Sequence, residues 1–205
     1  MRVINQRRGL SIWQWLALLL AAMLLVGGLY IAALVMAPAV APRFSDPIDI
    51  AKVEPASVGD DRIIIPKIGV NIAYGTNGEA SLDEGAWWRY PDRGNPAEGG
   101  NFIIAAHRFT LHNSITETIE KSPFYNVGQL MTGDQIFVDY EGKRYLYEVD
   151  KTYTVLPSQT EIEAPSETAK LTLYTCSLGG ESDGRVVVNG KLLGEVAKVT
   201  SSRYN

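Results

Sequence analysis

Cys176, the single cysteine of the 205-residue chain, is the residue best suited to covalent chemistry. It ends an apolar run at residues 171–176. Arg185 begins a second run of β-branched residues after residues 177–184, which contain three glycines and predict a loop. If the two runs pair as a hairpin, Cys176 and Arg185 lie opposite each other on strands about 4.8 Å apart. The spacing therefore predicts a guanidinium beside the thiol, or beside an acyl group attached to it.

A thiol with an unperturbed pKa of about 8.5 needs a base or a positive charge nearby to react well at neutral pH. The chain has two histidines, His107 and His112. His107 directly follows the apolar run 102–106, where a buried strand would end, whereas His112 lies in a polar stretch beyond it. We therefore predict that His107 is the base, and we interpret Arg108 and His112 as structural or substrate-adjacent. One cysteine and two histidines are too few for a zinc site.

Short runs rich in β-branched and aromatic residues, separated by Gly, Pro and Asp turns, dominate the chain after residue 61. Residues 140–143 are typical of a tight hairpin connection. Helical patterns are fewer, at residues 79–87 and 113–121. We therefore predict a mainly β domain of seven or eight strands, closed into a barrel rather than left as an open sheet. The expected strands are residues 62–66, 71–74, 101–105, 135–139, 144–149, 170–175 and 185–188.

An apolar segment at residues 12–37 precedes this domain, and no charged residue occurs between Arg8 and Arg43. The segment exceeds the roughly 20 residues that a helix needs to span a bilayer. Three arginines lie before it, so the positive-inside rule predicts a cytoplasmic N-terminus at residues 1–11 and an extracellular domain. The expected location is the cytoplasmic membrane, with a single span. The three arginines are Arg2, Arg7 and Arg8.

A cleaved signal peptide is the alternative interpretation, because residues 39–41 (Ala-Val-Ala) resemble a small-residue cleavage site. The apolar run is about twice the roughly 7 to 15 residues of a signal h-region, and Pro42 would follow the cut. Trp13 and Trp15 stand at the inner edge, where aromatic side chains anchor membrane helices. We therefore favour a retained anchor.

Residues 38–61 contain four prolines and predict a semi-extended stalk, so that the folded domain occupies residues 62–205.

All 23 acidic residues lie after residue 45, against 15 of the 19 basic residues, which leaves the part after residue 45 with a net charge of −8. That balance argues against nucleic-acid binding. A single cysteine allows no internal disulfide.

The sequence around these residues resembles the sortase family. The family's T-L-x-T-C strand corresponds to Thr172-Leu173-Tyr174-Thr175-Cys176, with an arginine nine residues further on. Residues 63–68, 100–108 and 133–138 resemble its first strand, its histidine-bearing strand and its G-D-x-I-x-V strand. The resemblance covers roughly residues 62–194. One departure is Ala106 before His107, where the family often has glycine.

The resemblance implies an eight-stranded sortase barrel and a cysteine transpeptidase. Such enzymes cleave an LPXTG-like sorting motif near the C-terminus of exported proteins, hold the acyl part as a thioester, and pass it to an amine. It assigns Cys176 as the nucleophile, His107 as the general acid and base, and Arg185 as the stabiliser of the oxyanion. The expected result is attachment of proteins to the cell wall.

The expected partners are exported proteins with a C-terminal sorting motif, and an acceptor amine such as a peptidoglycan precursor or a pilin lysine. No cofactor and no resident metal are expected. Glu181 and Asp183 leave calcium as an alternative, since some sortases bind it through loop carboxylates. Substrate choice is expected to lie in residues 110–126 and 153–169, which should flank the cleft.

Two other functions stay open at this point. A pilin-polymerising sortase is one, although the single hydrophobic segment argues against it and Asp46-Pro47, before Ile48, matches that class's Asp-Pro-aromatic lid only in part. A catalytically idle sortase-like domain that binds other surface molecules is the second. A papain-like or NlpC-like peptidase would place its cysteine before its histidine, the reverse of the order here.

Overall fold

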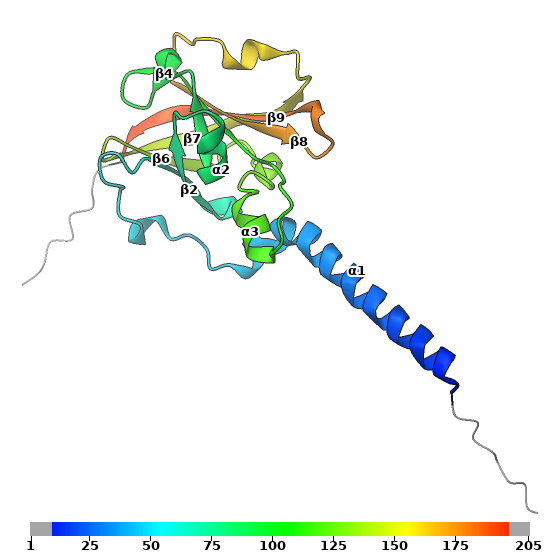
Figure 1. Cartoon of the computed structure of the whole chain (residues 1–205). Helices are drawn as coiled ribbons and strands as arrows, with labels where there is room; N and C mark the ends of the chain where they lie inside the picture. The colour runs from blue at the N-terminus through cyan, green and yellow to red at the C-terminus, as the bar shows by residue number, and fades with distance from the viewer. Residues whose placement is uncertain (1–9, 197–205) are drawn as a thin grey trace, which may run out of the picture.

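Eight strands within the described residues, 10–196, close into a barrel in this computed structural model (Figure 1). The strand order is β3-β2-β1-β6-β7-β9-β8-β5, and pairing of β3 with β5 completes the ring. The short strand β4 (Gly94–Asn95) pairs with β5. The predicted closed eight-stranded barrel is therefore confirmed. The barrel strands are β1 (Arg62–Ile65), β2 (Val70–Gly75), β3 (Ala86–Arg89), β5 (Gly99–Ala106), β6 (Gln135–Tyr140), β7 (Lys143–Val155), β8 (Lys170–Ser177) and β9 (Gly180–Glu195).

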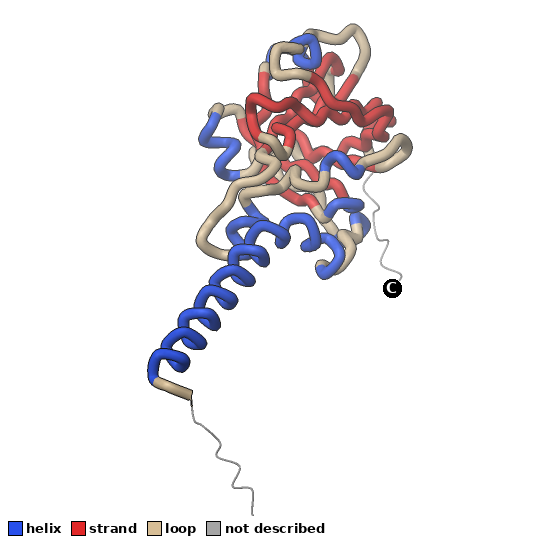
Figure 2. The backbone as a smooth tube through the Cα atoms, turned by 90° about the vertical axis from the view of Figure 1, so that its right-hand side faces the viewer, coloured by secondary structure: helices blue, strands red, loops and turns tan. Residues whose placement is uncertain are grey.

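Helices are few and stand outside the barrel (Figure 2). A long N-terminal helix leaves the domain on one side, and the part of the chain that the structure describes has two short α-helices and five 3-10 turns in its connections. They are α1 (Ile12–Phe44), α2 (Glu79–Glu84), α3 (Ile115–Glu120), η1 (Ile50–Lys52), η2 (Pro66–Ile68), η3 (Pro91–Arg93), η4 (Val127–Gln129) and η5 (Thr160–Glu163).

The period-two alternation of the strands separates two apolar groups. In β8, Leu171 and Leu173 are fully buried in the main core. Tyr174 belongs to a second group on the other face, which includes Val187 and is covered in part by Ile162 of η5. Cys176 shares the face of Tyr174, because the two are two residues apart. The connection that contains η5 therefore covers the face on which the thiol lies.

The sequence patterns misassigned residues 85–87 and gave residues 88–89 no element. The helix predicted at 79–87 ends at Glu84, and Ala86–Arg89 form β3, which pairs with β5 and closes the barrel. Gly85 follows the helix and is packed against the backbone of Ala73, where a Cβ would meet the carbonyl oxygen at 2.5 Å. A helix cannot continue through this contact, and the two tryptophans of β3 suit a strand.

Strands β7 and β9 are much longer than the runs at 144–149 and 185–188 predicted. Their antiparallel pairing extends from Tyr145 with Glu195 to Val155 with Arg185, across two irregularities in register. Because of this pairing, polar residues that show no pattern of apolar side chains also adopt the strand conformation. Residues 180–184, predicted as loop, are the first part of β9. The tight connection at 140–143 is confirmed, with Glu141 and Gly142 both at positive φ as a two-residue hairpin loop requires.

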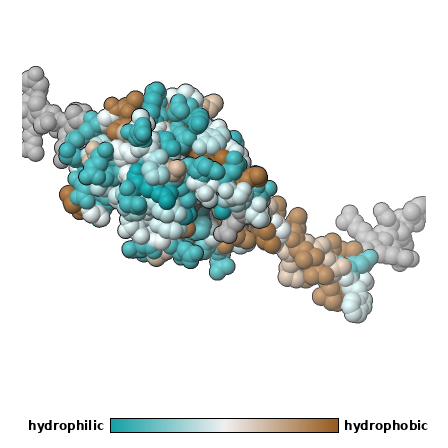
Figure 3. All heavy atoms as spheres, turned by 90° about the horizontal axis from the view of Figure 1, so that it is seen from above, coloured by the Kyte–Doolittle hydropathy of each residue, from teal (hydrophilic) through white to brown (hydrophobic). Residues whose placement is uncertain are grey.

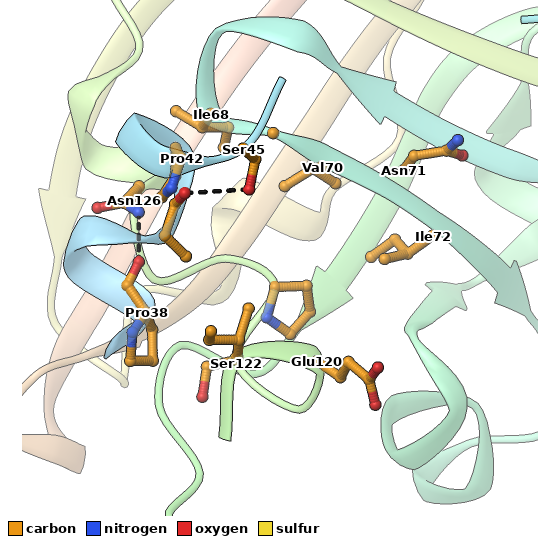
Figure 4. Close-up of a pocket in the computed structure, with 14 residues that line it drawn as sticks. Pro38, Pro42, Ser45, Ile68, Val70, Asn71, Ile72, Glu120, Ser122 and Asn126 are labelled. Atoms are coloured by element: carbon orange, nitrogen blue, oxygen red, sulfur yellow. Dashed lines mark hydrogen bonds between the residues drawn. The ribbon is translucent and has the colours of Figure 1, made fainter. Parts of the chain in front are cut away.

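Helix α1 continues to Phe44, so the predicted stalk is wrong for residues 38–44, which are helical. Pro42 has no N–H to donate to the carbonyl of Pro38, four residues earlier. Asn126 supplies the missing donor, with its Nδ2 at 2.8 Å from the Pro38 oxygen in a buried contact (Figure 4). The proline therefore does not end the helix, because the domain satisfies the carbonyl that it leaves unpaired.

Residues 50–56 are also bound to the barrel rather than extended from it. Arg144 of β7 donates to the carbonyl oxygens of Val53 and Glu54, the latter at 3.1 Å, and its Nε lies 2.6 Å from Asp139 Oδ1. The N–H of Ala56 donates to the same carboxylate at 2.9 Å. Asp139 and Arg144 are both buried. The linker is thus part of the folded domain, because a buried ion pair fastens it.

Candidate active site

Cys176 and Arg185 are cross-strand partners in the antiparallel pair β8–β9, as the spacing predicts. Paired residues share one face of a sheet, so both side chains lie on the outer face with Tyr174. Both are half-buried, and Cys176 carries a free thiol. Arg185 Nη1 also donates to the carbonyl of Gly184 at 3.0 Å. The hairpin therefore places a cation and a thiol side by side.

His107 follows the last residue of β5, a strand that runs parallel to β8. Ala105 pairs with Tyr174, so His107 and Cys176 follow two residues later at the same edge of the sheet. Thr175 Oγ1 ties the two strand ends together through the carbonyl of Ala106, at 2.7 Å. The three predicted residues thus come from three adjacent strands: His107 follows β5, Cys176 lies near the end of β8, and Arg185 lies within β9.

The His107 backbone is held by the segment that leads to the following turn, where Phe124 N donates to its carbonyl at 3.1 Å. Its Nε2 lies 3.8 Å from Asp83 Oδ1. Because both side chains are solvent-exposed, at 37% and 79%, this contact is weak and screened by salt. The imidazole is therefore positioned by the backbone and remains accessible.

A cavity of about 150 Å³ lies next to Arg185 on the same face as Cys176, lined also by Tyr174, Arg89 and Glu163. The Tyr174 hydroxyl donates to Glu163 Oε1 at 2.5 Å, and Arg89 Nε lies 3.2 Å from the same oxygen. Burial raises the pKa of Tyr174, and the Glu163 carboxylate raises it further, so the phenol keeps its proton. The connection 156–169 thus forms a fixed wall of the site.

Arg89 and Glu163 were not found by sequence reasoning. Arg89 follows residues interpreted as a helix, and Glu163 lies in a polar connection with no pattern of its own. The closure of β3 onto β5 and the packing of η5 over β8 bring them to the wall beside Tyr174. No local signal could have shown this.

The second segment expected to flank the cleft, residues 110–126, begins three residues after His107. Arg108 lines an open cavity of about 460 Å³ together with Ser177 and Val186. Burial lowers the pKa of Arg108, and its neighbour Phe109 packs edge to face against Tyr125. His112 lies further along, where its N–H bonds to Thr118 Oγ1 at 3.1 Å.

The calcium alternative rests on two carboxylates of the segment after Cys176, Glu181 and Asp183. Asp183 Oδ2 accepts a hydrogen bond from Ser177 Oγ, and the side chain of Glu181 lies outside the described part of the chain. Among the described side chains, no three of His, Cys, Asp or Glu gather as metal ligands would.

The family model for the Sortase domain matches residues 63–193, a stretch that contains all three predicted catalytic residues. The chain belongs to the sortase family. It is 29% identical over 149 residues to "Sortase SrtE1" of Streptomyces coelicolor, a match that covers 64% of this chain and 39% of that relative. The chain thus spans about two-fifths of the length of this relative.

Solved sortases share the fold. A Clostridium perfringens "Sortase D5 transpeptidase" is 27% identical with a TM-score of 0.52, covering 71% of this chain and 84% of that one. Listeria monocytogenes sortase A is 26% identical with a TM-score of 0.54, covering 70% and 93%. These sortases and the Streptomyces relative carry names of different classes, so what the comparisons identify is the sortase family.

Proposed function

We propose that the chain is a membrane-anchored sortase that cleaves an LPXTG-like motif of exported proteins through a thioester on Cys176 and transfers the acyl part to an amine. The observation that carries the proposal is the cross-strand pair of Cys176 and Arg185 beside the end of β5 that bears His107. A thiol, a base and an oxyanion donor are the groups that acyl transfer needs.

In the proposed reaction His107 takes the proton of the Cys176 thiol, and the resulting Sγ thiolate attacks the carbonyl carbon of the scissile bond. The carbonyl oxygen becomes an oxyanion, which the Arg185 guanidinium stabilises. Collapse breaks the C–N bond, and the leaving amine takes a proton from His107. The acceptor amine then attacks the thioester, passes a proton to His107 and expels the Cys176 thiolate. An amide replaces an amide, so no cofactor is needed.

The anchor in this proposal is α1. It is the one helix among the described residues that is long and apolar enough to span a membrane, and its surface is hydrophobic whereas much of the domain surface is hydrophilic (Figure 3). The arginines that predict a cytoplasmic N-terminus lie outside the described residues. With that orientation the barrel is extracellular and meets exported proteins there.

The test is mass spectrometry of the full chain in detergent, incubated with LPXTG-like peptides and with either glycine or a lysine-containing peptide as acceptor. We expect cleaved peptide joined to the amine, and a peptide adduct on Cys176. His107→Ala should lose the activity and its matched control, His112→Ala, should keep it. Turnover by Cys176→Ala would refute the mechanism, and silence of the unmodified chain across the peptide library would support an idle binding domain.

The acceptor that is used separates wall attachment from pilin polymerisation. Pilin-polymerising sortases have an Asp-Pro-aromatic lid, and the position of the linker after Asp46-Pro47 does not favour such a lid in this chain. Residues 50–56, just after Asp46-Pro47, are held at Arg144, whereas Arg185 pairs with Val155 at the other end of β7. A glycine-type acceptor is therefore the expected substrate, and preference for the lysine peptide would contradict this part of the proposal.

A further inference from the structure

The segment that follows His107 is bonded to α1 near the expected outer boundary of the membrane. Tyr30 OH donates to the carbonyl of Asn113 at 2.6 Å. With Trp15 at the inner boundary, Tyr30 lies about 22 Å further along the helix, at 1.5 Å per residue. The hydrocarbon layer is about 30 Å thick, and any tilt of the helix lowers Tyr30 further. Tyr30 therefore lies inside the layer, about 8 Å below its outer boundary, and its bond keeps Asn113 close to that boundary.

Helix α1 meets the domain immediately above this point. Leu34 and Ala37, one and two turns beyond Tyr30, are buried at 6% and 7% exposure, whereas the helix before Tyr30 is exposed. Figure 1 shows α3 at the side of the domain from which α1 leaves. The Tyr30–Asn113 bond and the burial of Leu34 and Ala37 thus indicate the same level on α1 for the start of the domain.

Three large apolar side chains are exposed in the segment that Tyr30 binds. Leu111 is 53% exposed, Ile115 40% and Phe109 36%. They stand on both sides of Asn113, and Ile115 is the first residue of α3. Apolar side chains that are solvated singly are common, but a group beside a membrane helix at the boundary is continuous with a lipid-facing surface.

We infer that Phe109, Leu111 and Ile115 form a membrane-contact edge, which inserts into the outer interface of the bilayer. The partner is lipid, because the edge continues the apolar surface of α1 and the Tyr30–Asn113 bond fixes its level. The inference rests on the proposal that α1 spans the bilayer. Since four residues extend over at most about 14 Å, it also places His107 within that distance of the membrane surface.

The experiment uses the full chain with Cys176→Ala, which leaves no other cysteine for labelling. Single cysteines introduced as Leu111→Cys or Ile115→Cys carry an environment-sensitive fluorophore, and the protein is reconstituted in phosphatidylcholine–phosphatidylglycerol vesicles with or without nitroxide-labelled lipid. Leu193→Cys is the matched control, because Leu193 is 52% exposed and lies on β9. Leu24→Cys reports on α1 itself.

We expect the labels at Leu111 and Ile115 to lose fluorescence to the nitroxide lipid nearly as strongly as the label at Leu24, and the label at Leu193 to lose none. If Leu24 is quenched while Leu111 and Ile115 match Leu193, the edge does not contact lipid and the inference is overturned although the anchor stands. If Leu24 is not quenched either, the anchor itself fails. Shielding of Leu111 from both lipid and a water-soluble quencher would indicate a protein partner, which also overturns it.

Discussion

The β8–β9 hairpin is part of the barrel wall, whereas residues 38–61, the end of α1 and the linker after it, pack against the barrel, and the two regions are fixed by different kinds of contact. In the hairpin, regular pairing places Cys176 opposite Arg185, so positions follow from counting residues along two strands. In the linker, single side chains far away in sequence, Asn126 and Arg144, bond to carbonyl groups of the chain. The hairpin is therefore robust to most substitutions, whereas the linker depends on a few.

Cys176→Ala should have the largest effect on activity and almost no effect on the stability of the fold. We expect complete loss of peptide cleavage, because no other thiol is present to form the acyl intermediate. The half-buried side chain contributes little to packing, so the thermal unfolding midpoint should change little. Peptide cleavage and circular dichroism measure the two effects. A large fall in the midpoint would mean that the site and the hairpin are not independent.

Arg185→Ala should lower kcat by a factor on the order of 10² to 10³, the range for loss of one oxyanion donor. Arg185→Lys keeps the positive charge but lacks the planar guanidinium with its paired N–H donors. We therefore expect its activity to lie between that of Arg185→Ala and that of the unmodified chain. Initial rates at saturating peptide measure this. Equal activities of the alanine and the unmodified chain would remove Arg185 from the proposed mechanism.

Arg144→Ala tests the linker, and we expect a loss of about 3 to 5 kcal/mol in the free energy of unfolding, because Asp139 remains buried without its partner. The carbonyl groups of residues 53 and 54 lose their donors as well. Lys143→Ala is the matched control, since its ion pair with Glu195 is exposed and should matter little. Urea unfolding compares the two variants. Equal unfolding midpoints for Arg144→Ala and Lys143→Ala would show that the Arg144–Asp139 pair does not fasten the linker.

Asn126→Ala should release the end of α1 from the domain without unfolding the barrel. The Pro38 carbonyl then lacks a donor in a buried position, a cost of about 1 to 3 kcal/mol. Hydrogen exchange should quicken in residues 34–45 and stay unchanged in β8 and β9. Faster exchange throughout the barrel would show that the helix end and the barrel unfold together.

Asp61→Asn is expected to have the smallest effect. Burial raises the pKa of Asp61 above the usual carboxyl range, although a backbone bond from Glu141 opposes the shift. A raised pKa means that folding favours the protonated form, so ionisation of Asp61 costs stability as pH rises through its folded-state pKa. The asparagine variant should be slightly more stable at neutral pH and equal to the original chain in acid. A larger difference in acid would contradict this sign.

The strand signals predicted the barrel because its strands are short runs of β-branched and aromatic residues between turns. Residues 171–176 are such a run, and both faces of it are covered, so that residues 171–175 are all buried. They failed for β3, since the pairing of Ala86–Arg89 with β5 and the close packing of Gly85 are tertiary contacts. The lengths of β7 and β9 were likewise hidden, because polar residues become strand there through pairing with each other.

The sequence by itself determined that Cys176 and Arg185 meet and that His107 ends a strand, since local pairing and periodicity decide both. It also determined the apolar segment at residues 12–37. Tertiary structure alone decided that α1 continues past Pro42, that Arg144 fastens the linker, and that Glu163 and Arg89 stand beside Tyr174. These contacts join residues dozens of positions apart, and their partners are chosen by the closed barrel rather than by any pattern in the chain.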